Sequence, residues 1–167
     1  MKKLIALLLL ILPFVGSVNA QEVKIAFVNT QEVFMAMPEV ADMQKKLDDL
    51  NAKYKKELET MQGEFQKKYS AFVAEQDSLN ENIKVKRMQD IQDMQQRMDN
   101  FVQVAQQDVQ KQQQELITPI QQKIADAIKA VGAEKGYTYI IDPQVLLYTA
   151  PNAVNATSFV KTKLGLK

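Results

Sequence analysis

Three side chains near the C-terminal end have types and spacing that could support acid–base chemistry. They are the carboxyl group of Asp142 and the phenols of Tyr137 and Tyr148. For catalysis, a general acid and a general base must converge on one substrate. A structural role explains these residues better, with the aspartate in a turn and the two tyrosines in strands. The chain has neither histidine nor cysteine. This composition rules out Cys–His and Ser–His–Asp catalytic sites, histidine-based zinc sites and disulfides. We expect no enzyme, no metal site and no cofactor.

The first 20 residues have the pattern of a secretory signal peptide. Lys2 and Lys3 are followed by an apolar run over 4–12, which Pro13 ends, and small residues precede a cut after Ala20. The run is too short to cross a bilayer, which needs about 20 residues. An uncleaved anchor is the less favoured alternative. We expect an exported protein that is cleaved after Ala20 and has no stable membrane insertion.

The charge of the mature chain is close to zero. Loss of Lys2 and Lys3 from the 21 basic residues leaves 19, against 20 acidic residues, so the net charge is near −1. A balanced chain gives no reason to expect nucleic acid or an anionic membrane surface as a partner. We expect neither.

Residues 39–118 predict a long arm made of two antiparallel amphipathic helices. From Pro38 to Pro119 the chain has no other proline and a single glycine, Gly63. Apolar residues recur in steps of three and four, which is typical of helices that pack along one seam. A polar turn over 77–80 predicts the tip. The outward seam consists of Val40, Met43, Leu47, Leu50, Tyr54, Leu58, Met61, Phe65, Tyr69 and Phe72.

Two residues predict places where the arm bends. Gly63 lowers helix stability by about 1 kcal/mol relative to alanine and could act as a hinge. Pro119 removes one backbone hydrogen bond inside the return helix, so we expect a kink where the arm meets the body.

Residues 21–38 and 119–167 predict a small β-containing body. Alternation over 23–28 predicts a strand, and 137–148 predict a β-hairpin whose turn begins at Asp142. Asn155 is expected to cap a last helix. The apolar residues of these strands are expected to form the contacts between copies of the chain: Ile25, Phe27, Tyr139, Ile141, Val145 and Leu147.

The predicted fold class is α+β, mostly α: a long helical hairpin, or coiled-coil tentacle, on a small β body that oligomerisation completes. A two-helix pair buries only one narrow stripe, and a three-stranded sheet leaves two edges open. Cysteine crosslinks are absent. Self-association is the remaining way to close the sheet and stabilise so small a core.

Several segments resemble the Skp/OmpH family of periplasmic chaperones. Residues 24–34, Lys-Ile-Ala-Phe-Val-Asn-Thr-Gln-Glu-Val-Phe, resemble the opening strand and turn of this family. Residues 127–148 and 155–165 are similar to its later motif and its closing helix. The resemblance implies a periplasmic homotrimer with three tentacles, which holds unfolded outer-membrane proteins in a central cavity without ATP.

A protein that holds unfolded chains needs adaptable contacts, and methionine supplies them because it is flexible and polarizable. Helical phase places four residues off the seam as candidates for such contacts: Val73, Val85, Met94 and Val104. The alternative function is a structural coiled-coil protein of the envelope, whose arms bind a folded partner. Capture of an unfolded β-barrel protein would favour the chaperone, and a stable folded partner on the arms would favour the structural protein.

Overall fold

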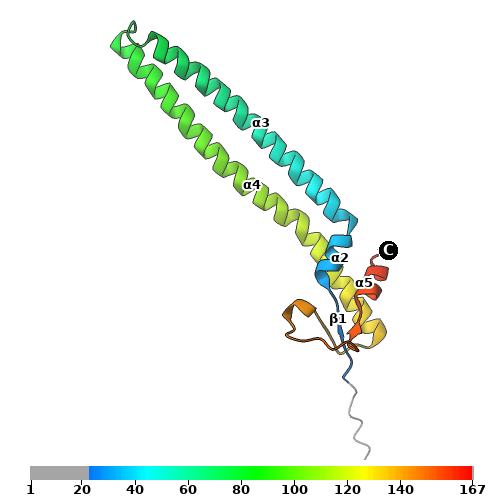
Figure 1. Ribbon diagram of the computed structural model, residues 1–167. Coiled ribbons are helices and arrows are strands. Elements are labelled where there is room, and N and C mark those ends of the chain that lie inside the picture. Colours follow the sequence, from blue (N-terminus) through cyan, green and yellow to red (C-terminus); the bar gives the residue numbers. More distant parts are fainter. Residues whose placement is uncertain (1–22, 167) are drawn as a thin grey trace, which may run out of the picture.

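A long arm of two helices projects from a small body in the computed structural model, which describes residues 23–166 (Figure 1). The predicted signal peptide lies outside the described residues. Within them, no helix is long and apolar enough to cross a membrane. The chain enters the body, runs out along one helix, and returns along the other into the body.

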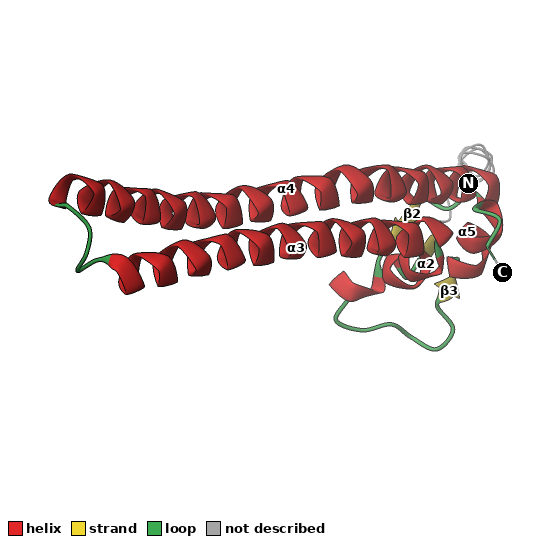
Figure 2. Ribbon diagram, turned by 90° about the horizontal axis from the view of Figure 1, so that it is seen from above, coloured by secondary structure: helices red, strands yellow, loops and turns green. Residues whose placement is uncertain are grey.

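The arm is formed by α3 (Pro38–Glu75) and α4 (Glu81–Lys135), which lie side by side along their length (Figure 2). Pro38 occupies the start of α3, where a missing N–H leaves no hydrogen bond unmade. At the tip, the Asn80 side chain accepts a hydrogen bond from the backbone N–H of Ile83 at 3.0 Å and so caps α4. The tip therefore lies in the short polar segment between the two helices.

The seam between α3 and α4 follows the predicted steps of three and four. Its aromatic centre is an edge-to-face contact between Tyr54 and Phe101, with ring centroids 5.8 Å apart. The buried members of the arm seam are Met43, Leu47, Phe72, Ile91, Met94, Met98 and Ala105.

Helix α4 continues through Pro119 into the body. The Thr118 hydroxyl donates a hydrogen bond to the carbonyl of Gln114 at 2.7 Å, beside the backbone position where proline has no N–H. The helix ends at Gly136, whose φ of 67° is the left-handed conformation that glycine adopts without strain. The hinge role of Pro119 stays a prediction.

The sheet of the body has three short strands in the order β2-β1-β3. The central strand β1 (Ile25–Phe27) pairs in parallel with β2 (Tyr139–Ile141) on one side and with β3 (Val154–Asn155) on the other. Both outer strands come from the C-terminal part of the chain. The body is therefore closed by contacts between the two ends of the described sequence.

The predicted hairpin over 137–148 is wrong. After β2, Asp142 turns its side chain to accept the N–H of Gln144 at 2.9 Å, and a short 3-10 helix, η1 (Pro143–Val145), follows. Since proline has no N–H to give to a sheet, the chain leaves the sheet here and returns only at β3. Val145 and Leu147, expected in a second strand, lie outside the sheet.

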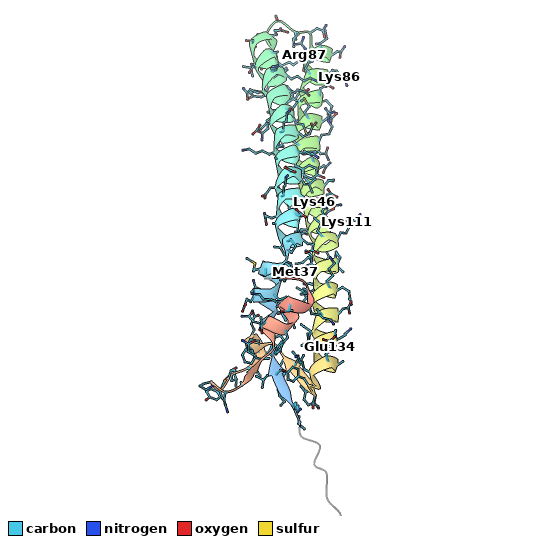
Figure 3. All side chains as sticks on the ribbon, turned by 90° about the vertical axis from the view of Figure 1, so that its right-hand side faces the viewer. Met37, Lys46, Lys86, Arg87, Lys111 and Glu134 are labelled. Carbon is cyan, nitrogen blue, oxygen red and sulfur yellow. The ribbon has the colours of Figure 1, made fainter. Side chains whose placement is uncertain are left out.

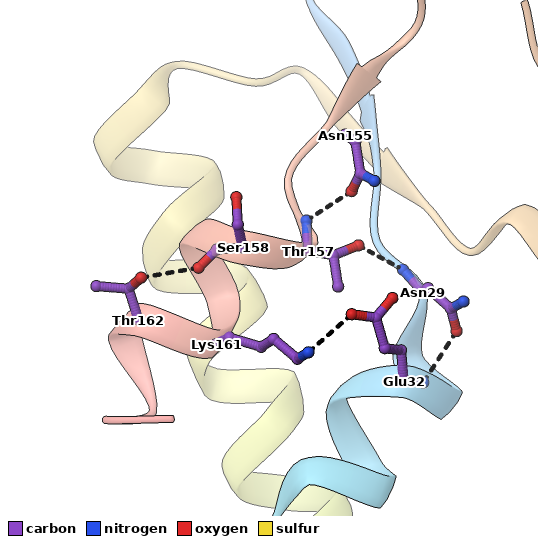
Figure 4. Close-up of polar contacts among 7 residues, drawn as sticks. All are labelled: Asn29, Glu32, Asn155, Thr157, Ser158, Lys161 and Thr162. Atoms are coloured by element: carbon purple, nitrogen blue, oxygen red, sulfur yellow. Dashed lines mark hydrogen bonds and ion pairs between the residues drawn. The ribbon is translucent and has the colours of Figure 1, made fainter. Parts of the chain in front are cut away.

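Helices α2 (Thr30–Ala36) and α5 (Thr157–Lys163) complete the body beside the inner end of α4. The Asn29 side chain caps α2, and Asn155 accepts the N–H of Thr157 at 2.9 Å where α5 begins. Figure 4 shows how these two starts meet. The buried core of the body is apolar and consists of Ala26, Val28, Val33, Met37, Ile120, Ile124, Ala127, Val131, Ala156 and Val160.

Candidate interaction surfaces

One face of the sheet is covered by the body's own helices, because alternate residues of a strand point to opposite faces. Ala26 of β1 and Val28, directly after this strand, are buried in the core, and Ile140 of β2 packs against that core. Position 132 of α4 approaches so closely that a Cβ there would lie 3.4 Å from the Ile140 side chain. This face supplies the hydrophobic core of a single copy.

The opposite face of the sheet carries apolar side chains that a single copy leaves open. Ile25 is 52% exposed and its neighbour in register, Tyr139, is 59% exposed. Phe27 and Ile141 are the next pair in register and are half-buried. The structure thus brings together four of the six residues predicted to join copies of the chain.

The other two predicted association residues lie on the connection between β2 and β3. Val145 is 74% exposed and Leu147 is fully exposed, as is most of Tyr148 next to it. They follow β2 in the chain but form no strand. In a single copy of the chain, these apolar side chains are exposed to solvent.

The arm residues predicted to lie off the seam divide into two groups. Val73, Val85 and Val104 are exposed, whereas Met94 is only 5% exposed and belongs to the seam. The prediction for Met94 is wrong, because the steps from Ile91 to Met94 and from Met94 to Met98 are three and four residues. Those are the steps of the seam itself.

The exposed methionine of the return helix is Met88. It is 40% exposed and lines a groove of about 310 Å³ near the tip, with Phe72, Val85 and Gln92. Helix α3 ends at Glu75, about one turn after Phe72, so it covers little of α4 beyond this point. The nearness of Met88 to the predicted tip turn, and not the spacing of apolar residues, was the sequence signal that could have predicted its exposure.

A second groove lies at the middle of the arm and measures about 410 Å³. The rings of Tyr54 and Phe101 line it, together with Val102, Ala105 and Gln106. The Tyr54 hydroxyl donates a hydrogen bond to Asp108 at 2.7 Å. That hydrogen bond to a carboxylate, followed by burial, raises the pKa of Tyr54, so the phenol stays neutral at physiological pH.

Comparison with known proteins gives the family of this chain. Residues 24–164 match the sequence model described as "Outer membrane protein (OmpH-like)". The chain belongs to the OmpH-like family.

Its curated relatives include the "Chaperone protein Skp" of Pectobacterium atrosepticum, 30% identical over 151 residues that cover 90% of each chain. The protein of that name from Yersinia enterocolitica is 27% identical over 152 residues, which cover 91% of this chain and 93% of the relative. A crystal structure of an OmpH-like protein from Caulobacter crescentus CB15 has the same fold. Its TM-score is 0.75 at 13% identity, and the match covers 85% of this chain and 83% of that one.

In this OmpH-like chain, Asp142 holds the body together by hydrogen bonds. Its carboxylate accepts the backbone N–H of Thr30 at 3.3 Å, the Thr30 hydroxyl, and the backbone N–H of Gln144. Burial acts to raise the pKa of Asp142, but these hydrogen bonds outweigh burial and lower it. Within residues 23–166, no hydrogen bond joins Asp142 to Tyr137 or Tyr148, and no cluster of acidic residues could hold a metal ion.

Proposed function

We propose that this OmpH-like chain is an ATP-independent periplasmic holdase, which binds unfolded outer-membrane proteins between the arms of a homo-oligomer. Its curated relatives carry the name chaperone, and family membership supports the trimer that the resemblance implies. The signal peptide pattern supports export and cleavage after Ala20.

The observation that carries this proposal is the open apolar face of the sheet. Ile25 and Tyr139 present aliphatic and aromatic surface to water on this face, and Phe27 and Ile141, the next pair in register, are half-buried beside them. Contiguous apolar surface of this kind marks an interaction site. Copies that join through this face bury it, and their arms then project from a shared body.

A holdase of this kind acts by mass action alone. Binding an unfolded chain in preference to its native form lowers the concentration of free unfolded chain without an energy source. The arm suits this task because it offers a long surface, whereas a folded partner needs one fitted contact patch. Two antiparallel helices of 38 and 55 residues supply that length.

The solution mass of residues 21–167 tests the proposal, with and without a urea-denatured outer-membrane β-barrel protein diluted into buffer. We expect an oligomer alone, and a discrete complex with one or few clients per oligomer when the client is added. A monomer that leaves the client to aggregate would overturn the proposal. A complex only with a folded envelope protein would favour the structural alternative.

A further inference from the structure

The residues of α4 on either side of the seam differ sharply in charge. A residue that directly follows a seam position points about 100° to one side of it, and a residue that directly precedes one points to the other side. Continued in steps of three and four from its buried members, the seam of α4 takes positions 87, 91, 94, 98, 101, 105, 109, 112 and 116. The nine residues that follow these positions include one charged residue, Asp99: Met88, Gln92, Gln95, Asp99, Val102, Gln106, Gln110, Gln113 and Ile117.

The nine residues of α4 that precede the seam positions have the opposite character, since seven carry a charge. Two intrahelical ion pairs lie among them, Lys86–Asp90 at 2.9 Å and Lys111–Glu115 at 3.8 Å. Lys86 and Lys111 are labelled in Figure 3. The full set is Lys86, Asp90, Asp93, Arg97, Asn100, Val104, Asp108, Lys111 and Glu115.

Helix α3 repeats this division. For the nine seam positions from Met43 to Phe72, three of the residues that follow are charged: Gln44, Asp48, Asn51, Lys55, Glu59, Gln62, Gln66, Ser70 and Val73. Seven of the nine that precede them are charged: Asp42, Lys46, Asp49, Lys53, Glu57, Thr60, Glu64, Lys68 and Ala71.

The grooves of the arm show that matching flanks of the two helices share a face. Asn51 and Lys55 of α3 line the mid-arm groove with Gln106 and Gln110 of α4, all from the flanks that follow the seam. We call this side the amide face. Lys68 and Ala71 line a smaller groove with Asp90, from the flanks that precede it, and this side is the charged face.

The larger grooves lie on the amide face. The mid-arm and tip grooves measure about 410 and 310 Å³. The two grooves on the charged face measure about 200 Å³ each. The amide face thus has more concave space for side chains of a bound chain.

The glutamines of the amide face are also available to a partner. Gln92, Gln106 and Gln110 are exposed, and no side-chain hydrogen bond occupies their amides within residues 23–166. Among the nine α4 residues that follow seam positions, the single carboxylate is Asp99, and it already accepts a hydrogen bond from Gln95 at 3.2 Å. At the tip groove, Glu81 and Lys84 also line this face. Each free amide can donate two hydrogen bonds and accept two.

We propose that the amide face is the surface on which this chain binds its unfolded client. An extended client segment lies over the mid-arm and tip grooves, its backbone bonded to glutamine amides and its apolar side chains in the grooves. The inference rests on the proposed holdase function. It adds which surface binds the client, which contacts hold it, and how client affinity responds to salt.

Three physical arguments favour this face for an unfolded chain. The backbone of such a chain carries N–H and C=O groups that lack partners, and an amide matches both. Uncharged amides cost less to remove from water than charged groups, which agrees with the depletion of charge at the centres of protein interfaces. The charged face is nearly balanced, with six basic and eight acidic residues, so it has no concentrated field to attract a client.

The test measures the dissociation constant for a urea-denatured outer-membrane β-barrel protein at 50 and 500 mM NaCl. We expect the wild-type constant to change by less than about threefold, because salt screens exposed charges and leaves amide bonds intact. Gln106→Glu with Gln110→Glu places two charges on the amide face, and we expect about tenfold weaker binding, or roughly 1.4 kcal/mol. The matched control is Gln103→Glu with Gln107→Glu, the same change at the same spacing on the side of α4 away from α3, with an effect below about twofold.

A second measurement does not depend on how the double variants fold. Because the chain has no cysteine, a dye on Gln106→Cys or on Lys111→Cys reports one face only. We expect the client to change the emission of the first dye and not of the second. Equal binding by the two double variants, a loss of more than about tenfold in salt, or a response of the Lys111→Cys dye alone would overturn the inference and leave the holdase standing. Failure of the wild type to bind any client would overturn the holdase itself.

Discussion

The Thr157 hydroxyl links the two ends of the described chain through a single hydrogen bond. It is a buried side chain, 3% exposed, and its oxygen accepts the backbone N–H of Asn29 at 3.0 Å. Figure 4 shows this contact beside the ion pair of Lys161 with Glu32, at 2.7 Å. The start of α2 and the start of α5 therefore depend on each other.

Thr157→Val keeps the shape of this side chain and removes its acceptor. We expect the free energy of unfolding to fall by about 1–3 kcal/mol, because the Asn29 N–H is then left without a partner inside the body. Urea unfolding followed by circular dichroism measures the loss. Thr162→Val is the control: its exposed hydroxyl bonds only the carbonyl of Ser158, and its effect should stay within about 0.5 kcal/mol. Equal losses for both variants would contradict this role.

Asp142 is the residue whose titration should affect the stability of the body. Its folded-state pKa is lowered, so its stabilising effect is present above the unfolded-state pKa, near 4, and is lost as the pH falls through the lower folded-state pKa. Asp142→Asn should lower the free energy of unfolding by about 1–2 kcal/mol at pH 7. The new amide nitrogen cannot accept the hydrogen bonds that Thr30 and Gln144 donate to the carboxylate. The difference in urea midpoint between wild type and variant should narrow below about pH 4. A midpoint difference that stays constant from pH 2 to 7 would contradict this role of the Asp142 carboxylate.

At the scale of the helices, Met94 and Met88 form a matched pair on α4, one in the seam and one in the tip groove. Met94→Ala should lower the free energy of unfolding by about 2 kcal/mol or more, since it opens a cavity in the seam. Met88→Ala removes a side chain that is 40% exposed and should cost well under 1 kcal/mol. Unfolding midpoints in urea compare the two, and a larger loss for Met88→Ala would reverse the assignment.

Gly63 lies inside α3 with open space around it, since a Cβ there would meet nothing within 4 Å. Gly63→Ala should stabilise the helix by about 0.5–1 kcal/mol and stiffen the arm. Spin labels near the tip, measured in the frozen oligomer, should then give a narrower distribution of distances between arms. An unchanged distribution would remove Gly63 as a hinge.

Sequence periodicity was sufficient for the helices and insufficient for the sheet. The arm seam repeats over many turns, and local signals such as Pro38 and Asn80 mark helix starts. The strands have only three, three and two residues, and their partners are distant in sequence. The local pattern over 137–148 therefore predicted an antiparallel hairpin. In the structure, β2 and β3 instead pair in parallel with β1, one on each side of it. The division of the arm into an amide face and a charged face was present in the sequence, but it needed the seam positions of both helices to become visible.

For the whole molecule, the open face of the sheet is the proposed contact between copies of the chain. Ile25→Glu with Tyr139→Glu places two carboxylates on that face. We expect the solution mass to fall to that of one copy and client capture to be lost, because buried unpaired charge costs several kcal/mol. The control is Val104→Glu, an exposed valine on the arm, which should leave the mass unchanged. An oligomer that survives the double change would place the contact elsewhere.

The position of β1 at the centre of the sheet also determines when the protein can fold. Both of its partners are more than a hundred residues later in the chain, as are the hydrogen bonds of Lys24 to Thr138 and of Asn29 to Thr157, at separations of 114 and 128 residues. Closing so long a loop is slow compared with forming helices. During synthesis, β1 therefore cannot be paired on both sides until residues 154 and 155 have been made, so the body cannot close while the arm is still being synthesised.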